Sequence, residues 1–214
     1  MNISVIGAHG SIARSLTHLL KKQGHEVRGL VRKESQFDDV RSDGAEPVLC
    51  DIESVGPEDL DTALAKSDVV VFAAGAGPGS GVERKHSVDR DGAIKSVDSA
   101  VRIGADRFLI ISSMGADSPP SDDDSFSVYL RAKAAADDAA RSAKIASTII
   151  RPGKLTDEEP TGRVRASSSV ERGEIPRRDV AAVLADLIDG NKGREQTFEL
   201  ISGTTPIPEA LQAS

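Results

Sequence analysis

Tyr129 is the one tyrosine of the chain, and Lys133 follows it four residues later. In a helix this spacing places both side chains on one face. A phenol with a pKa of about 10 transfers protons poorly at neutral pH, but an adjacent ammonium group favours the phenolate and lowers that pKa. The pair therefore predicts a general acid or base, with Tyr129 as the proton carrier. The alternative is a half-buried tyrosine packed at a helix start, with Lys133 on a solvated face.

A glycine-rich segment lies at the start of the sequence. Gly7 permits a sharp turn after an apolar run, Gly10 has no side chain to obstruct a phosphate, and Ala13 lets the following helix pack closely. A helix that begins near Ser11 would direct its free N–H groups and positive dipole end at the anion. This loop predicts dinucleotide binding. The alternative is an ordinary strand-to-helix turn that needs flexibility.

The residues after the second apolar run indicate which dinucleotide is bound. NAD-binding proteins usually carry a carboxylate there, which accepts hydrogen bonds from the ribose 2′-hydroxyl and would repel a 2′-phosphate. This chain has Arg32 and Lys33 instead. Because a guanidinium can grip a phosphate through two parallel hydrogen bonds, we predict NADP, with NAD as the alternative cofactor. The competing interpretation is a solvated Arg-Lys pair that interacts with Glu34.

Short β-rich runs alternate with amphipathic segments of helix length. This alternation predicts an α/β fold with a doubly wound, mostly parallel Rossmann sheet of about seven strands. The expected strands are residues 3–6, 25–31, 47–50, 69–73, 107–112, 147–151 and 197–201, and the expected helices are residues 11–23, 58–66, 84–103, 129–142 and 178–188. Two irregular stretches, residues 116–126 and 153–174, are expected to border the ligand crevice at the carboxyl ends of the strands. Solvated loops without a role are the alternative.

Composition narrows the class of protein. A chain of 214 residues, 38% of them hydrophobic, suits a single domain over residues 1–214, with residues 154–176 and the C-terminal tail as a small substrate-side lobe. The net charge of -7 without a basic block argues against nucleic acid. Cys50 is the one cysteine, the four histidines lack ligand spacing, and no apolar run is long enough for a membrane. We expect a cytoplasmic monomer or homodimer without a metal or a targeting segment.

Motifs spread over nearly the whole chain resemble the short-chain dehydrogenase/reductase superfamily. The likeness is to its atypical, extended-like members, small NAD(P)-binding Rossmann-fold proteins of the NAD-dependent epimerase/dehydratase-like group. The residues that carry it are Gly7-x-x-Gly10-x-x-Ala13, Val31-Arg32, Asp51, Ala73-Ala74-Gly75, Ser112-Ser113, Tyr129-Leu130-Arg131-Ala132-Lys133 and Arg151-Pro152-Gly153.

This resemblance implies roles for individual residues. Asp51 would reach the adenine, the small residues after the fourth strand would leave room for the cofactor, and Lys133 would also hold the nicotinamide ribose. Ser113 would bind the substrate oxygen, whereas alternation points Ser112 to the other face. The implied cofactor-binding set is Gly7, His9, Gly10, Ser11, Ile12, Arg32, Lys33, Asp51, Ile52, Ala73, Ala74, Gly75, Lys133, Arg151, Pro152 and Gly153, with the last three against the nicotinamide. The roles of Asp89, where many relatives carry Asn, and of residues 118–125 stay open.

The resemblance implies an NADP-dependent oxidoreductase or epimerase-like enzyme. Hydride transfer to or from a small carbonyl or alcohol substrate would accompany a proton relay through Ser113, Tyr129 and Lys133. Two alternatives remain: an NADP(H)-binding redox sensor or regulatory protein with little catalysis, and an NADPH-dependent flavin or quinone reductase in which Tyr129 is dispensable.

Overall fold

The computed structural model describes residues 1–77 and 79–212, so Ala213 and Ser214 of the predicted tail lie outside the described residues. The strands are β1 (Asn2–Ile6), β2 (Glu26–Val31), β3 (Glu46–Leu49), β4 (Val69–Phe72), β5 (Arg107–Ile111), β6 (Ala146–Pro152), β7 (Lys154–Thr156), β8 (Arg163–Ser167), β9 (Glu174–Pro176), β10 (Gln196–Ser202) and β11 (Thr205–Pro206). The helices are α1 (Ser11–Lys22), the 3-10 turn η1 (Glu34–Gln36), α2 (Phe37–Ser42), α3 (Pro57–Leu64), α4 (Val82–Arg84), the π-helical η2 (Lys85–Gly92), α5 (Ala93–Arg102), α6 (Ser125–Ser142), α7 (Arg177–Asp189) and α8 (Ile207–Ala210).

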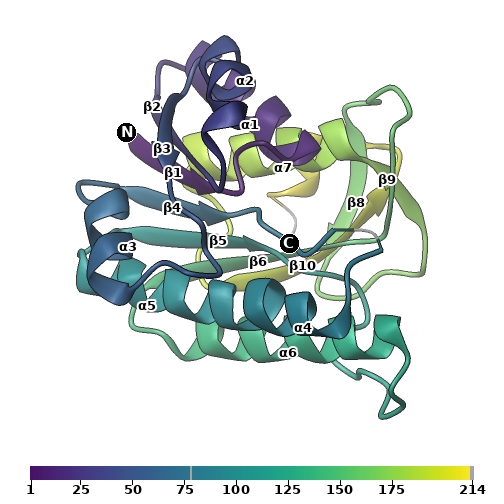
Figure 1. Ribbon diagram of the computed structural model, residues 1–214. Helices are drawn as coiled ribbons and strands as arrows, with labels where there is room; N and C mark the ends of the chain where they lie inside the picture. Colours follow the sequence, from purple (N-terminus) through teal and green to yellow (C-terminus); the bar gives the residue numbers. More distant parts are fainter. Residues whose placement is uncertain (78, 213–214) are drawn as a thin grey trace.

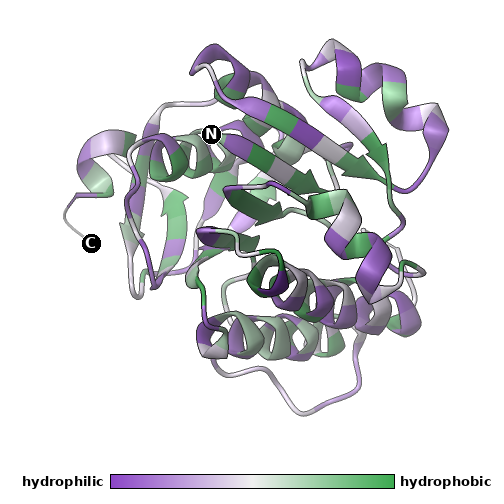
Figure 2. Cartoon of the chain, turned by 90° about the vertical axis from the view of Figure 1, so that its left-hand side faces the viewer, coloured by the Kyte–Doolittle hydropathy of each residue, from purple (hydrophilic) through white to green (hydrophobic). Residues whose placement is uncertain are grey.

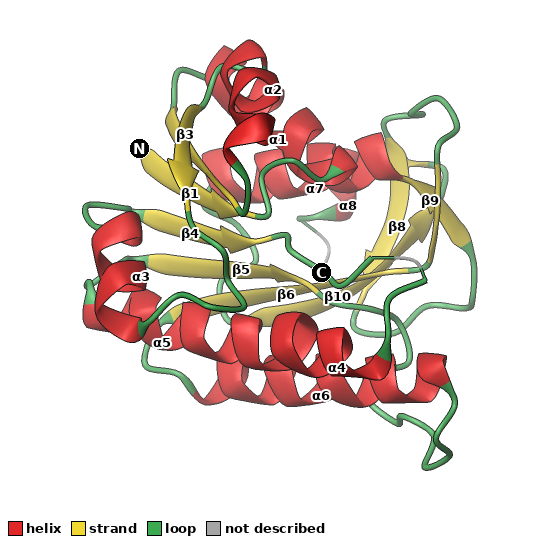
Figure 3. Ribbon diagram, viewed as in Figure 1, coloured by secondary structure: helices red, strands yellow, loops and turns green. Residues whose placement is uncertain are grey.

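Nine strands form the central sheet, in the order β11-β8-β10-β6-β5-β4-β1-β2-β3 (Figure 3). Pairing is parallel from β3 across to β10, and β8 runs antiparallel to both β10 and β11. The chain moves outward from β1 in one direction to β3 and in the other direction from β4. Strand order therefore reverses between β1 and β4, which is where an open α/β sheet opens a ligand crevice beyond its carboxyl ends.

Helices cover both faces of the sheet. In Figure 1, α1 and α7 lie on one face, and α3, α5 and α6 lie on the other. Successive residues of β4 enter opposite layers: Val69 and Val71 pack in the core beneath α1 and α7, whereas Val70 and Phe72 pack in the core beneath α5 and α6. Because both faces are buried, β4 is apolar along its whole length, and Figure 2 shows apolar residues in green along the strands between the two layers of helices.

The α/β Rossmann-like fold is confirmed, and its details correct the predicted element list. The main sheet has nine strands rather than about seven, and β7 and β9 form a separate parallel pair. The irregular stretch at 153–174 contains β7 and β8. The helix carrying Tyr129 begins at Ser125, because the Asp124 carboxylate accepts hydrogen bonds from the N–H groups of Phe126 and Ser127. Throughout 1–77 and 79–212, no helix is long and apolar enough to cross a membrane.

Candidate cofactor and substrate site

The loop after β1 requires a glycine at position 7. Gly7 has a φ of +81°, and a Cβ atom on it would lie 2.7 Å from the backbone N and Cα of Ala74. Gly10 is the N-cap residue of α1 and makes no side-chain capping bond. The first-turn N–H groups of α1 therefore have no intrahelical acceptors and stay available to an anion.

A pocket of about 270 Å³ opens beside this loop, and we call it the Arg32 pocket. It brings together residues that follow β1, β2, β3 and β4, among them Gly7, His9, Gly10, Arg32, Asp51, Ile52, Ala73, Ala74 and Gly75. Sequence reasoning missed Gln36, Glu53, Arg84 and Val88, which also line it. Glu53 directly follows Ile52, whereas the other three residues come from η1, α4 and η2, and none of the four carries a motif.

Arg32 is exposed in its pocket, and within the described part of the chain it makes no hydrogen bond or ion pair. The alternative pairing with Glu34 is thus not seen among those residues. His9, in contrast, has a partner, because its Nε2 lies 2.8 Å from Asp39 Oδ2. The hydrogen bond with His9 and the positive charge of the nearby Arg14 lower the pKa of Asp39. Ser11 and Lys33 are exposed and do not line the pocket.

A second pocket, the Lys133 pocket, continues from the first and has a volume of about 520 Å³. Both pockets share the segment 73–77 after β4, so they form one cleft. Ile12 lies on its wall. At its base the Lys133 Nζ donates to the Ile111 carbonyl at 2.9 Å and lies 3.4 Å from Asp89 Oδ1. Both charged side chains are buried, with 4% and 1% exposure.

The charge of Lys133 is sustained by its neighbours. Burial alone would lower the pKa of Lys133, but the negative charges of Tyr129, Asp89 and Asp137 outweigh burial and raise it. The Lys133 Nζ lies 5.7 Å from the centre of the Tyr129 ring, as the spacing of four residues predicts. Asp89, whose role the sequence leaves open, is the counter-ion of Lys133. Its carboxylate also accepts a hydrogen bond from the Ala76 N–H at 3.2 Å.

The third pocket, the Ser113 pocket, measures about 770 Å³. Ser112, Phe126, Tyr129, Leu155 and Arg177 line both this pocket and the Lys133 pocket, so Tyr129 lies where the two meet. Ser113 is half-buried, and its hydroxyl donates to the Met114 carbonyl at 3.2 Å. Ser112 is 4% exposed. The predicted irregular stretch 153–174 contributes several lining residues to this pocket. Of the stretch 116–126, only Ser125 and Phe126 line the pockets, and both belong to the first turn of α6.

The end of β6 contributes to the site in part. The Arg151 side chain is buried and forms ion pairs with Asp137 at 2.8 Å and with Asp117. Its guanidinium is therefore directed into the interface with α6 and lines none of the three pockets. Pro152 and Gly153 do line the Ser113 pocket.

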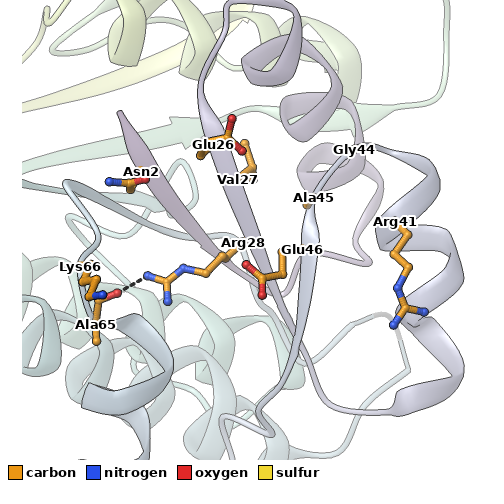
Figure 4. Close-up of a pocket in the computed structure, with 10 residues that line it drawn as sticks. All are labelled: Asn2, Glu26, Val27, Arg28, Arg41, Gly44, Ala45, Glu46, Ala65 and Lys66. Carbon is orange, nitrogen blue, oxygen red and sulfur yellow. Dashed lines mark hydrogen bonds between the residues drawn. The ribbon is translucent and has the colours of Figure 1, made fainter.

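A fourth hollow, of about 600 Å³, lies at the opposite edge of the sheet, around the amino ends of β2 and β3 (Figure 4). Its central cation, Arg28, donates to the Ala65 carbonyl and to Ser67 Oγ at 3.0 Å. The guanidinium thus anchors the turn between α3 and β4. None of the predicted site residues lines this hollow, so we assign it a structural role.

A family model described as NAD(P)H-binding matches residues 7–191. The chain belongs to this NAD(P)H-binding family. It is 36% identical to the Bacillus subtilis protein YhfK, called an uncharacterized sugar epimerase, with 99% of each chain covered. A Bacillus halodurans structure described as an NAD-dependent epimerase/dehydratase has 38% identity and a TM-score of 0.93, with both chains fully covered. The Lactococcus lactis oxidoreductase ylbE has 26% identity and a TM-score of 0.87, covering 100% of this chain and 96% of that one.

A nicotinamide dinucleotide fits the cleft of this NAD(P)H-binding protein. A Cβ on Gly7 would fill the turn, and one on Gly10 would lie 3.3 Å from the Gly7 carbonyl oxygen. The residues that would hold such a cofactor are the glycine loop, the small segment after β4, and the ends of β2 and β3. Their chemistry suits phosphate and ribose groups.

Proposed function

We propose that this protein is an NADP-dependent oxidoreductase or epimerase-like enzyme acting on a small carbonyl or alcohol substrate. The observation that carries the proposal is the position of Tyr129, which lines both the Lys133 pocket and the Ser113 pocket. A group shared by a cofactor cleft and a substrate-sized cavity is placed for proton transfer. The names of the YhfK and ylbE relatives, an epimerase and an oxidoreductase, support the same class of chemistry.

In this proposal Tyr129, Lys133 and Ser113 have different roles. Tyr129 passes a proton between its hydroxyl oxygen and the substrate oxygen, and the buried Lys133 ammonium lies 5.7 Å from the centre of its ring. Ser113 turns its hydroxyl from the Met114 carbonyl to the substrate oxygen and orients it. Bound NADP supplies the hydride chemistry. Epimerisation would use the same three residues.

The substrate side of the proposal rests on the segment 154–176. Leu155, Ser169 and Arg172 of this segment line the Ser113 pocket. We therefore assign residues 154–176 to a small substrate-side part of a single NAD(P)-binding domain. A cavity of about 770 Å³ suits a small substrate, since ligand pockets commonly measure about 300–1,000 Å³.

Proton transfer is tested with Tyr129→Phe, which removes only the hydroxyl. NADPH oxidation is measured with a panel of small carbonyls, quinones and flavins. We expect turnover to fall about 100-fold or more while the dissociation constant of NADP stays unchanged. Activity that survives the change supports flavin or quinone reduction instead, and tight NADP binding without turnover on any substrate supports a redox sensor.

The choice of NADP over NAD is tested at Arg32. Within the described residues its guanidinium has no hydrogen-bond or ion-pair partner, which supports binding of the 2′-phosphate through charge-assisted hydrogen bonds. Titration should show that Arg32→Ala weakens NADP binding about tenfold or more and leaves NAD binding unchanged. Arg41→Ala is the matched control, because Arg41 is also exposed but lines the hollow at the opposite edge. Equal affinities for the two dinucleotides in the unmodified protein would contradict the assignment.

A further inference from the structure

The Ser113 pocket has an apolar wall and a cationic end. Met114, Phe126, Leu130, Leu155 and Val170 supply the apolar side chains. Phe126 is a large hydrophobic residue left 59% exposed, and its ring stacks on that of Tyr129 with a centroid distance of 6.0 Å. An exposed aromatic ring beside the proton carrier gives an apolar substrate a surface to lie against.

Positively charged side chains outnumber carboxylates among the described lining residues of this pocket. Lys154, Arg172 and Arg177 line it, whereas Glu199 is the one carboxylate among its described lining residues. One oxygen of Glu199 already accepts the Val170 N–H at 2.9 Å. The Lys154 Nζ lies 2.6 Å from Glu174, so Lys154 has a counter-ion. Arg172 and Arg177 are the other two cations of the pocket.

Arg172 makes no hydrogen bond or ion pair within the described residues, although it is exposed at the pocket. Arg177 lines both the Ser113 and the Lys133 pockets, as Tyr129 does, and its NH1 lies 2.8 Å from Asp157 Oδ1. The Asp157 side chain is 84% exposed. An exposed ion pair of this kind is weak, so an incoming anion can displace Asp157 at little cost.

We infer that the substrate of the proposed reaction carries a carboxylate or a phosphate, held by Arg172 and Arg177, on an apolar body that packs against Phe126 and Leu155. This inference rests on the proposed function for the carbonyl or alcohol that reacts at Tyr129. Guanidinium groups bind both kinds of oxyanion through paired hydrogen bonds. The position of Arg177 at the junction of the two pockets directs the anionic group toward the reacting carbon.

Calorimetric titration with three aromatic probes tests the anion site. Benzoate, phenyl phosphate and benzyl alcohol share an apolar ring, and they differ in whether they carry a carboxylate, a phosphate or no charge. The protein is first saturated with NADP, so that the glycine loop is occupied and does not bind the probes. We expect at least one anion to bind at least tenfold more tightly than benzyl alcohol, and its affinity to fall as salt is added. The tighter of the two anions identifies the oxyanion.

Variants of the arginines locate the binding. Arg172→Met and Arg177→Met should each weaken the preferred anion about tenfold and leave benzyl alcohol unchanged, and Arg177→Lys should retain part of the affinity. Arg178→Met is the matched control, because Arg178 neighbours Arg177, pairs with Glu159 at 3.0 Å and lines none of the pockets. Equal binding of the three probes, or an equal loss in Arg178→Met, would overturn the inference.

The two proposals fail in different ways. Turnover that survives Tyr129→Phe removes the proton relay and leaves the calorimetric result unaffected. Binding of benzyl alcohol as tight as that of the anions removes the anion site and leaves the Tyr129 result unaffected. If NADP does not bind, the proposed function fails, and the same titration of the protein alone still tests the anion site by its dependence on Arg172 and Arg177.

Discussion

Lys133 and Asp89 form a buried ion pair at the base of the cleft, and each depends on the other. Removing one partner of such a pair leaves an uncompensated charge in a poorly solvated place. We expect Asp89→Leu to lower the free energy of unfolding by about 3 kcal/mol, measured by urea denaturation. The Asp89→Leu/Lys133→Met double variant should recover part of that loss, because neither charge then remains.

An exposed pair provides the comparison for this prediction. Arg178 and Glu159 lie 3.0 Å apart, with side chains 60% and 86% exposed. Glu159→Ala should cost less than about 1 kcal/mol, since water screens exposed charges. A loss in Asp89→Leu no greater than that in Glu159→Ala would show that Lys133 does not need its counter-ion.

Cys50 gives a prediction about pH. Burial raises the pKa of this thiol to about 11, and the positive charge of Lys95 only partly opposes that effect. Because the thiolate is the reactive form, alkylation by iodoacetamide should accelerate about tenfold per pH unit between pH 7 and 10 and level off near pH 11. Cys50 lines the Arg32 pocket, so NADP should slow the reaction. A rate that levels off at about pH 9–10, as expected for an ordinary thiol with a pKa of about 8.5 in the urea-unfolded chain, would contradict a buried thiol.

Single residues could be predicted from sequence where the relevant contacts are local. Tyr129 and Lys133 were found from a spacing of four residues, and Gly7 from its position after a strand. Arg177 could not be predicted, because it lies at the start of α7 and lines the same pockets as Tyr129 of α6 only through the tertiary fold. The ion pairs of Arg151 could not be predicted either, because Asp137 and Asp117 belong to other elements.

At the scale of elements, Arg107 of β5 is hydrogen-bonded to the carboxyl end of α7. Its guanidinium is 1% exposed and donates to the Leu187 carbonyl at 2.7 Å, to Thr148 Oγ1 at 2.8 Å and to the Lys192 carbonyl. Burial lowers the pKa of Arg107 to about 10, so the group stays charged at neutral pH. Arg107→Met would remove all of these hydrogen bonds, and among the described residues the Leu187 carbonyl would keep only the Lys192 N–H as a donor.

We expect Arg107→Met to cost about 2–4 kcal/mol of unfolding free energy in urea denaturation. Amide protection from hydrogen exchange should fall first in the last turn of α7, because that turn loses its external donor. Arg102→Met is the control: Arg102 pairs with Asp61 at 2.8 Å at a partly exposed site and should cost less than about 1 kcal/mol. Equal losses in the two variants would argue against the anchoring role.

Helices and strands could be predicted where the periodic pattern of apolar residues extends over enough positions to be recognised. The central strands and α1, α5 and α7 follow their patterns, whereas β7, β9 and β11 span only two or three residues. The strand β8 lies near the sheet edge, and its alternation covers only Arg163–Ser167. The π-helical segment Lys85–Gly92 interrupts the predicted helix. The sequence does not predict this segment, because hydrogen bonding between residues i and i+5 leaves no recognisable signal in the apolar pattern.

At the scale of the whole molecule, the cleft crosses the point where strand order reverses. A dinucleotide bound there would contact the β1–β3 side through the Arg32 pocket and the α6 side through the Lys133 pocket. A ligand that binds only the folded state at 100 times its dissociation constant stabilises that state by about 2.7 kcal/mol. For a chain of this length we therefore expect NADP to raise Tm by about 5–10 °C, measured by calorimetry.

Gly10→Val should abolish this shift in Tm, because the new side chain would occupy the space for the pyrophosphate. The backbone of Gly10, with φ of -69°, accepts a side chain, so the free protein should still fold. Gly56→Val is the matched control: Gly56 is likewise an N-cap glycine without a side-chain capping bond, with φ of -74°, but it precedes α3 and lines none of the cleft. Both variants should lower the Tm of the free protein slightly, since valine is a poor N-cap residue. Only Gly56→Val should keep the response to NADP, and a full response in Gly10→Val would place the dinucleotide outside the glycine loop.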